Sequence, residues 1–548
     1  MTTTTTQMMT GGEALVDALL RHGVSHVFGI PGVQTYGLFD ALQRAGERIR
    51  TIGARHEQTA GYMAFGYAKA SGREGVYSVV PGPGVLNTAA ALCSAYGAST
   101  PVLCLTGQVP SQFIGSGMGH LHELPDQLGT LRTLVKWAAR AAHPSEAPRL
   151  VAEAFAQMRV GRPQPVALEM PWEVFAQRAP VQPIDPPAAY PRVAVDTDAI
   201  ARVADLLQQA RQPMIMTGSG AQHAAAEVRA LAELLQAPAV PWRGGRGVVA
   251  EDTPLGFNCA SGLARWADTD VVIGIGSRIE LQWFRWPAPP RGMPAVALID
   301  IDPAQMARLR PRVGVVADAR EATAALVAEL ERRGHRAASR HAEFDAHKRR
   351  VQEAVQEVKP HVDYLRAIRA ALPRDGFFVE EICQTGFASY FALPVYEPRS
   401  FVTCGYQGTL GFGYPTALGV KVARPDKAVV SIAGDGGFMF GVQELATAVQ
   451  YGINVVSIVF DNGAFGNVMR DQQQRFGGRV ISSELRNPDF VRLAESFGVS
   501  AWRARSPDEL GTMLHRAIEL DRPALIHVPV DRAAEVSPWK YLMPALAA

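Results

Sequence analysis

Short apolar runs that end in a glycine-containing turn and lead into an amphipathic helical pattern recur along this chain. Examples of such runs are 27–30, 76–80 and 429–433. This alternation is typical of parallel sheets, because each parallel strand is joined to the next by a crossover helix that covers the sheet. The sequence therefore predicts an α/β protein whose parallel sheets are flanked by helices.

The pattern divides the chain into three blocks. A proline-rich stretch at 179–191 separates the first block from the second, and a charged stretch at 320–358, predicted to be helical, precedes the third. Three domains agree with a length of 548 residues. We expect an N-terminal domain over 1–178, a central domain over 190–340 and a C-terminal domain over 360–548.

Composition and charge exclude several classes of partner. The 54 Lys and Arg residues nearly cancel the 52 Asp and Glu residues, so the net charge of +2 supplies no general attraction for nucleic acid. The longest apolar stretch, 76–105, is interrupted by prolines and glycines and is too broken to cross a membrane. The N-terminus lacks a secretory signal, and the five cysteines form no CxxC pair. We expect a cytoplasmic protein that binds neither nucleic acid nor membranes.

Two turns in the third block each follow an apolar run. The first, 434–437, reads Gly-Asp-Gly-Gly, and the second, 461–463, reads Asp-Asn-Gly. In a parallel sheet both turns lie at the carboxyl edge, where ligands bind. Glycines let backbone N–H groups approach a phosphate, and Asp435 and Asn462 offer oxygen ligands that suit Mg²⁺. Either turn alone could be no more than a turn, but together they predict a magnesium and phosphate site.

Gly434-Asp435-Gly436, followed after 24 residues by Asp461-Asn462, resembles the thiamine diphosphate (ThDP) motif, in which Gly-Asp-Gly is followed at similar spacing by Asn-Asn. Asp461 departs from the commoner Asn, whereas Asn462 matches the metal-binding position. The resemblance implies that Asp435, Asn462 and the backbone carbonyl of Ala464 hold Mg²⁺. It also implies cofactor contacts in this block from Gln384, Thr385, Gly408, Leu410, Gly434, Gly436, Gly437, Ala464 and Phe465.

The glycine-rich segment 405–413 adds a second family match. The resemblance places Leu410 beneath the cofactor as a wedge that brings its two rings together, with the carbonyl of Gly408 near the amino group of the pyrimidine. The turn at 384–386 occupies the place of a loop that contacts the diphosphate. The alternative is that 405–413 is simply a turn before a core helix over 415–423, with Leu410 in the core.

The first block contains a carboxylate that the same chemistry requires. Segment 55–68 resembles the family's His-Glu and Gly-Tyr-Ala segment, and Glu57 follows a predicted strand and opens a helix. A buried carboxyl group has a raised pKa and can share a proton with the aminopyrimidine ring of ThDP, which promotes loss of the C2 proton. The alternative is that Glu57 only stabilises a helix N-terminus. The resemblance also assigns cofactor contacts to Pro31, Gly82 and Asn87.

The resemblance covers 11–544 and is closest to the acetolactate synthase-like branch, with benzaldehyde lyase among the relatives. Val33 stands where decarboxylases carry an Asp or Ser, and the missing proton donor favours carbon–carbon ligation. Benzaldehyde lyase-like enzymes carry a His near position 34 and a Gln near 122, whereas this chain has Gln34 and His122. An imidazole with an ordinary pKa near 6.5 can move protons at a carbonyl. His122 could also be an ordinary polar loop residue.

The resemblance implies an Mg²⁺- and ThDP-dependent carboligase with Glu57, His122 and Gln34 as catalytic residues. It would decarboxylate a 2-oxo acid such as pyruvate and ligate the product to a second carbonyl, giving a 2-hydroxy ketone or acid. The alternative is a lyase or hydrolase that cleaves a 2-hydroxy ketone or diketone. The expected substrate pocket contains Val33, Gln34, His122, Asn467 and Val468.

Two further expectations concern the assembly and a second cofactor. In this family the first and third blocks bind opposite ends of ThDP across a subunit interface, which implies a homodimer or homotetramer. Segment 276–281 lacks the Phe-Asp-Asp-Arg run of flavin-containing synthases, and Gln472 replaces their substrate-shaping Trp. We therefore expect no tight requirement for FAD. The glycine turns at 218–220 and 274–276 could still approach a bound nucleotide. The same glycines are the sole support for a dinucleotide-dependent dehydrogenase, and the intact Glu57 argues against a catalytically silent homologue.

Overall fold

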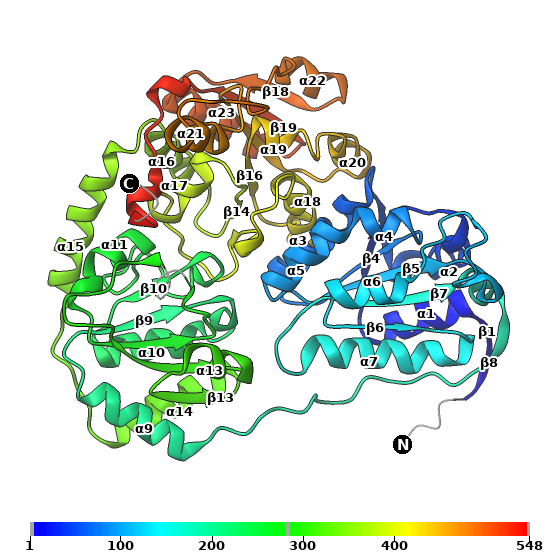
Figure 1. Cartoon of the computed structure of the whole chain (residues 1–548), viewed down its shortest axis with the longest axis horizontal. Coiled ribbons are helices and arrows are strands. Elements are labelled where there is room, and N and C mark those ends of the chain that lie inside the picture. The colour runs from blue at the N-terminus through cyan, green and yellow to red at the C-terminus, as the bar shows by residue number, and fades with distance from the viewer. Residues whose placement is uncertain (1–4, 281–284, 545–548) are drawn as a thin grey trace.

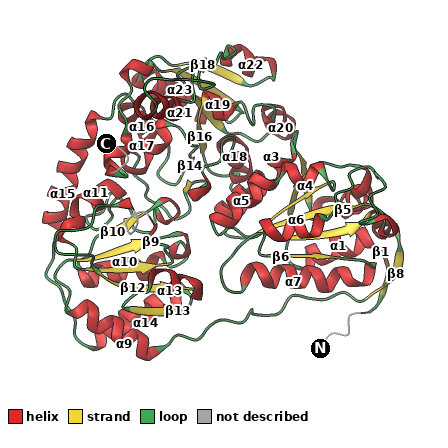
Figure 2. Ribbon diagram, in the orientation of Figure 1, coloured by secondary structure: helices red, strands yellow, loops and turns green. Residues whose placement is uncertain are grey.

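The structure is a computed structural model that describes residues 5–280 and 285–544 (Figure 1). Three parallel sheets follow one another along the chain, and Figure 2 shows helices on either side of their strands. The predicted α/β class is therefore confirmed. Two parts of the sequence predictions, residues 1–4 of the N-terminus and Leu281 in the segment 276–281, lie outside the described residues.

The N-terminal domain is built on a six-stranded parallel sheet. Its strands are β1 (Gln7–Thr10), β2 (His26–Gly29), β3 (Arg50–Gly53), β4 (Gly75–Val79), β5 (Val102–Gln108), β6 (Trp137–Arg140), β7 (Val166–Pro171) and β8 (Arg178–Val181). Its helices are α1 (Gly11–Arg21), α2 (Tyr36–Ala45), α3 (Glu57–Ser71), α4 (Pro83–Asn87), α5 (Ala89–Gly97), α6 (Gln127–Leu134), α7 (Ala147–Arg159) and α8 (Trp172–Ala176). The sheet order is β3-β2-β4-β5-β7-β6, and β1 pairs with β8 in a separate antiparallel ribbon. Because β8 reaches Val181, the domain extends slightly past the predicted limit at 178.

The central domain carries a five-stranded parallel sheet in the order β10-β9-β11-β12-β13. Its strands are β9 (Pro213–Thr217), β10 (Ala239–Pro241), β11 (Val271–Ile275), β12 (Ala295–Asp300) and β13 (Val313–Val316). Its helices are α9 (Thr197–Gln208), α10 (Ala225–Leu235), α11 (Cys259–Arg265), α13 (Pro303–Leu309), α14 (Ala319–Arg332) and α15 (His341–Ala354). The charged stretch 320–358 is thus two helices, and α14 buries Leu326 and Leu330 in the core that it shares with the central sheet.

The C-terminal domain carries a second six-stranded parallel sheet, in the order β15-β14-β16-β17-β19-β18. Its strands are β14 (Phe377–Val379), β15 (Phe401–Val402), β16 (Val429–Gly434), β17 (Val456–Asp461), β18 (Ser500–Arg503) and β19 (Ala524–Pro529). Its helices are α16 (His361–Ala371), α17 (Gln384–Ala392), α18 (Gly413–Ala423), α19 (Asp435–Phe438), α20 (Glu444–Tyr451), α21 (Gly466–Arg475), α22 (Phe490–Ser496) and α23 (Pro507–Leu520). The side chains of β16 are buried from Val429 to Ala433, as expected for a parallel strand covered on both faces.

The N-terminal and C-terminal sheets share one strand order. When the strands of each sheet are numbered along the chain, leaving aside the β1–β8 ribbon, both sheets read 2-1-3-4-6-5. The two domains are therefore copies of one topology, although their sequences share little more than the rhythm of strand, glycine turn and helix. In both sheets the polar turns identified in the sequence follow the carboxyl ends of the strands, where ligands bind.

Helices α3 and α18 pack against each other and join these two domains (Figure 1). A Cβ atom on Gly66 would lie 2.1 Å from the carbonyl oxygen of Thr416, and one on Gly419 would lie 1.9 Å from the carbonyl oxygen of Met63. Glycine is therefore needed where the two backbones meet. The contact fixes α3, which begins at Glu57, against the C-terminal domain.

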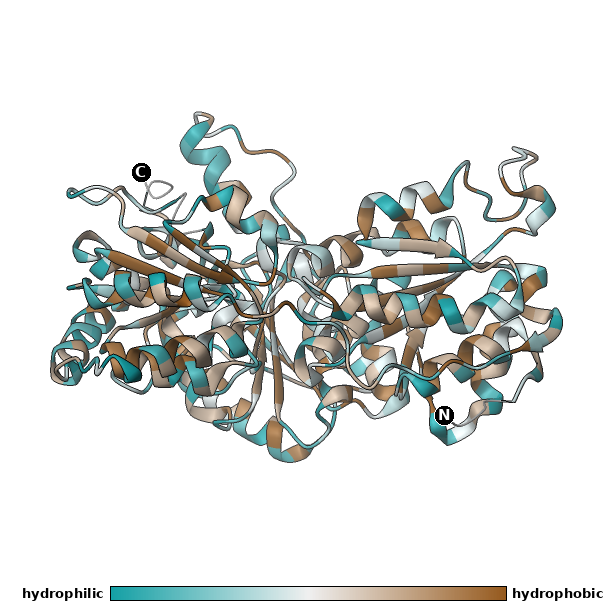
Figure 3. Cartoon of the chain, turned by 90° about the horizontal axis from the view of Figure 1, so that it is seen from below, coloured by the Kyte–Doolittle hydropathy of each residue, from teal (hydrophilic) through white to brown (hydrophobic). Residues whose placement is uncertain are grey.

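The hydropathy of the chain follows this architecture. Figure 3 shows apolar strands in the interior and polar stretches on the outer helices. Among the described residues, no helix is long and apolar enough to span a membrane.

Candidate active site

A cavity of about 100 Å³ lies at the carboxyl edge of the C-terminal sheet, beyond β14, β16 and β17. The sequence predictions that line it are Gln384, Thr385, Leu410, Gly434, Asp435, Gly436, Gly437, Asn462, Ala464, Phe465, Asn467 and Val468. Gly408 does not line it, although its φ of +59° gives the loop a conformation that favours glycine. The structure thus brings nearly all of the predicted diphosphate and metal residues to one place.

Two acids at neighbouring strand ends share a single amide. The Nδ2 atom of Asn487 donates to Asp435 Oδ2 at 2.6 Å and to Asp461 Oδ1 at 2.8 Å. His527 Nε2 lies 3.0 Å from Asp461 Oδ2. Burial, with the nearby Asp461, raises the pKa of Asp435, while hydrogen bonds from His527 and Asn487 outweigh burial and lower the pKa of Asp461. Asp461, the departure from the family pattern, is therefore linked to Asp435 through Asn487.

Asn462 is held in a second network that sequence reasoning missed. Its Oδ1 accepts the N–H of Ala464 at 3.1 Å, and its Nδ2 donates to Glu535 Oε2 at 2.9 Å. His361, from the start of α16, places Nδ1 3.0 Å from Thr385 Oγ1 and Nε2 3.4 Å from Glu535 Oε1. Glu535 and His361 both line the cavity, but neither belongs to a local motif that could have identified it.

The residues around this cavity fit a magnesium-bound diphosphate. One buried polar atom that lines it, Gln384 Oε1, has no hydrogen-bond partner among the described residues, and His361 Nε2 has only the 3.4 Å contact with Glu535 Oε1. Nor do the described residues contain a cluster of three or more His, Cys, Asp or Glu able to hold a metal. A cation here would rely on Asp435 together with neutral oxygens from Asn462 and Ala464, a donor set that suits Mg²⁺ when phosphate oxygens and water complete the shell.

The N-terminal domain assembles the other predicted residues at its own carboxyl edge. Asn87 Nδ2 donates to Glu57 Oε2 at 3.0 Å, and His122 Nδ1 lies 2.9 Å from Gln34 Oε1. The Gln34 amide also donates to the carbonyl of Leu121 at 2.8 Å. A Cβ atom on Gly82 would lie 2.5 Å from the carbonyl oxygen of His122. Gln34 and His122, both expected in the substrate pocket, are thus hydrogen-bonded partners.

One chain does not bring these two sites together. No described residue of the N-terminal domain lines the diphosphate cavity. The N-terminal domain reaches the Leu410 loop through Ser94, whose Oγ lies 2.9 Å from Thr409 Oγ1, and Gln58 Nε2 lies 3.4 Å from the position of a Cβ atom on Gly411. Around Glu57, Asn87 and Pro31 are exposed, and Val33 is half-buried. The N-terminal site therefore presents an open face.

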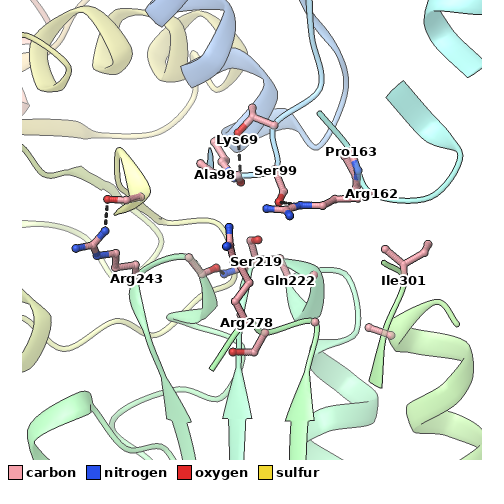
Figure 4. Close-up of a pocket in the computed structure, with 18 of the residues that line it drawn as sticks. Lys69, Ala98, Ser99, Arg162, Pro163, Ser219, Gln222, Arg243, Arg278 and Ile301 are labelled. Atoms are coloured by element: carbon pink, nitrogen blue, oxygen red, sulfur yellow. Dashed lines mark hydrogen bonds between the residues drawn. The ribbon is translucent and has the colours of Figure 1, made fainter. Parts of the chain in front are cut away.

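A larger cavity of about 350 Å³ lies at the junction of the three domains (Figure 4). The predicted glycine turns contribute Gly218, Ser219, Gly220 and Gly276 to its wall, and six cations also line it: Lys69, Arg159, Arg162, Arg243, Arg278 and Arg399. Lys69 Nζ donates to the carbonyl of Ala98 at 2.6 Å, and burial, with nearby Arg399 and Arg162, lowers its pKa to about 7. This chemistry fits a phosphate-containing ligand, so the expectation that FAD is not required stays untested.

The replacement of the synthase Trp by Gln472 has a structural role. The side chain of Gln472 donates to the carbonyl of Ile481 at 3.0 Å and accepts the N–H of the same residue at 3.2 Å. It also accepts from Ser483 Oγ at 2.8 Å. Gln472 therefore holds the loop beside Ala464 and Phe465, whose N–H donates to the carbonyl of Ser483.

Comparisons with known proteins agree with this geometry. Family models described as "Thiamine pyrophosphate enzyme" match the chain three times: the N-terminal TPP binding domain at 9–130, the central domain at 200–326 and the C-terminal TPP binding domain at 382–528. A probable 2-ketoarginine decarboxylase of Pseudomonas aeruginosa is 34% identical over 92% of this chain and 90% of its own length. A probable acetolactate synthase large subunit of Methanocaldococcus jannaschii is also 34% identical, over 96% and 92%, and the isozyme 2 large subunit of Escherichia coli is 32% identical over 97% of each chain. The chain belongs to the thiamine diphosphate-dependent enzymes and is an acetolactate synthase-like member of that family.

Proposed function

We propose that this enzyme decarboxylates a small 2-oxo acid such as pyruvate and ligates the resulting two-carbon unit to a second carbonyl. The observation that carries the proposal is the pair of sites at the carboxyl edges of two sheets of the same topology. One site holds Asp435 and Asn462 around a phosphate-sized cavity. The other holds Glu57 in a hydrogen bond with Asn87.

The C-terminal cavity is the proposed anchor for the cofactor. Asp435, Asn462 and the Ala464 carbonyl would hold Mg²⁺, and Gln384, Thr385 and the glycines of 434–437 would contact the diphosphate. When bound, ThDP supplies the nucleophilic carbon and the electron sink that decarboxylation needs. The protein binds and orients these groups and keeps water away from them.

Glu57 is the proposed proton-sharing group for the pyrimidine ring. Asn87 Nδ2 fixes one oxygen of its carboxylate and leaves the other free to face the ring. His122 and Gln34, hydrogen-bonded to each other, are proposed to hold or move a proton at the carbonyl oxygen of the substrate. Val33 has no proton donor to offer the reacting carbon of the substrate, which supports ligation over release of an aldehyde.

A second copy of the chain is the proposed source of the missing half of each site. The diphosphate cavity contains no described residue of the N-terminal domain, while Glu57 and Asn87 lie on an open face. Exposed apolar side chains flank both regions: Leu86 is 47% exposed, Val468 52% and Phe440 53%. A homodimer or homotetramer would cover them and complete both sites.

Product analysis tests the direction of the reaction. With pyruvate alone, Mg²⁺ and ThDP, we expect CO₂ and acetolactate in equal amounts, measured by mass spectrometry. A 2-oxo acid with a small, uncharged side chain suits the proposed pocket, because His122 is the one titratable side chain among Val33, Gln34, His122, Asn467 and Val468. Inert pyruvate together with cleavage of a 2-hydroxy ketone would contradict ligation, and CO₂ release from 2-ketoarginine but not from pyruvate would contradict the substrate.

Asn487 tests the metal site without altering a metal ligand. Asn487→Ala removes the amide that holds Asp435 and Asp461, so we expect the apparent affinity for Mg²⁺ to fall about 10–100-fold. The measurement is a Mg²⁺ titration of ThDP binding followed by tryptophan fluorescence. Asn454→Ala is the matched control, because Asn454 Nδ2 makes a similar bond to Asp521 at 3.0 Å on an exposed surface. Equal affinities in the two variants would argue against a metal at Asp435.

A further inference from the structure

A second buried carboxylate lies directly beneath the loop that carries Leu410. Glu381 follows β14 and is 1% exposed. Its Oε1 accepts the N–H of Gly411 at 2.9 Å, and its Oε2 accepts the N–H of Gly413 at 2.8 Å. Gly411 is the residue after Leu410, and Gly413 is the first residue of α18. One side chain therefore holds the backbone immediately after Leu410 and the start of the helix that packs on α3.

The surrounding glycines leave room for this carboxylate. A Cβ atom on Gly437 would lie 1.9 Å from Glu381 Oε1, and one on Gly413 would lie 2.9 Å from Glu381 Oε2. Gly411 has a φ of +75°, and a Cβ atom there would lie 2.5 Å from Cβ of Phe440. Three elements thus meet at Glu381: the Leu410 loop, the turn after Asp435, and α18.

No cation balances the charge of Glu381 among the described residues. The interactions that favour its ionised form are the two backbone N–H groups, and Glu380 beside it opposes ionisation. The N-terminus of α18 adds the favourable end of a helix dipole. Burial raises the pKa of Glu381 to about 7. A buried carboxylate without a neighbouring cation is costly, and this one contacts the loop that the cofactor would touch.

We propose that Glu381 is a positioning residue, which sets the Leu410 wedge beneath the cofactor by accepting the N–H groups of Gly411 and Gly413 together. This inference rests on the proposed function, because it assigns the wedge to Leu410. The ionised carboxylate accepts both bonds. A protonated carboxyl group carries its proton on one oxygen, which becomes a much weaker acceptor, so one of the two N–H bonds is weakened.

The direction of the pH dependence follows. As the pH rises above about 7, Glu381 is ionised and holds the loop at both points, and as the pH falls below that value one of the two bonds is weakened. The other titratable groups that face it are Glu380, Cys383, Cys404 and Tyr62. Burial raises the pKa of Tyr62 to about 12, and it raises the pKa of the Cys383 and Cys404 thiols well above their ordinary value. These three groups therefore stay neutral near pH 7.

The test compares Glu381→Gln with Glu380→Gln in the full-length protein. Glu380 is as deeply buried, but it bonds Tyr390 and Thr403, and its Oε2 has no partner among the described residues. In protein without ThDP, we expect Glu381→Gln to raise amide hydrogen exchange of Gly411 and Gly413 at least ~10-fold. Glu380→Gln is expected to leave it unchanged. This measurement does not depend on turnover, so it tests whether Glu381 holds the loop even if the proposed function is wrong.

Two measurements with ThDP complete the test. We expect Glu381→Gln to slow deuterium exchange at C2 of bound ThDP at least ~10-fold while retaining most of the ThDP affinity, because the diphosphate site is untouched. Wild-type protein should lose this exchange as the pH falls through about 7. Glu380→Gln should lose it at a lower pH, because it removes the charge that opposes ionisation of Glu381, and Glu381→Gln should show no such loss. Glu381→Asp keeps the charge but is too short to reach both N–H groups, so its loop exchange should also rise.

Three results would overturn the proposal. The first is unchanged amide exchange at Gly411 and Gly413 in Glu381→Gln. The second is an equal loss of amide protection in Glu380→Gln. The third is a loss of C2 deuterium exchange at acid pH that persists in Glu381→Gln. Misfolding is checked by the melting temperature at pH 8. A carboxyl group whose pKa is raised in the folded state costs stability as the pH rises through that pKa, so Glu381→Gln should melt no lower than wild type there.

Discussion

Replacing Glu57 by Gln is expected to lower kcat by about 10²–10⁴-fold, the usual contribution of a positioned acid–base group. The amide has nearly the same shape and can still contact Asn87, but it cannot share a proton with the pyrimidine ring. The affinity for ThDP should change little, because Asp435, Asn462 and the glycine turn anchor the other end of the cofactor. The measurements are steady-state turnover of pyruvate and ThDP binding by calorimetry.

The control for this variant is Glu47→Gln, an exposed acid of the same domain that touches neither site. It should retain wild-type turnover. Asn87→Ala is expected to show a smaller loss than Glu57→Gln, since it frees the carboxylate that its amide holds at 3.0 Å but leaves it in place. Full activity in Glu57→Gln would remove the proposed mechanism, whatever the effect of Asn87→Ala.

One physical rule explains why much of the site could be predicted from the sequence. A polar residue directly after an apolar strand of a parallel sheet lies at the edge where ligands bind. Asp435 and Asn462 follow β16 and β17 directly, Glu57 follows β3 after three further residues, and each lies at such an edge. The family resemblance added the pairing of these edges around one cofactor.

The same rule also applies to Glu381. Glu380 and Glu381 follow β14 directly, and two acids after a buried strand are as informative as Asp435 after β16. Burial alone could not have assigned their roles. The bonds of Glu381 go to Gly411 and Gly413, which lie 30 and 32 residues away in the chain.

Other residues of the site had no signal in one sequence. His361 and Glu535 reach the cavity from the start of α16 and from the segment after β19, and their partners are 24 and 73 residues away. The shared strand order of the two outer domains was also hidden, because topology is preserved by buried strands whose apolar residues can exchange freely. Such relations arise from the fold and not from local patterns.

Mixing two inactive variants is expected to restore activity if each site is shared between two chains. Glu57→Gln leaves the diphosphate site intact, and Asp435→Asn leaves the Glu57 site intact. A dimer with one chain of each kind has one site with both defects and one with neither. Random pairing of equal amounts should therefore give about a quarter of the wild-type activity, because half of the dimers are mixed and each has one working site of two.

The decisive form of this experiment purifies the mixed dimer through two different tags after co-expression. Its turnover with pyruvate should be about half that of wild type, as expected for a two-fold symmetric pair with one intact site. The double variant Glu57→Gln/Asp435→Asn paired with a wild-type chain is the control: each of its sites carries one defect, so it should be inactive if sites are shared. If instead each chain used its own Glu57, the first pairing would stay inactive and this control would show half activity. The two pairings give opposite results for shared sites and for sites built from one chain, so the outcome identifies which chain supplies the carboxylate to each cofactor.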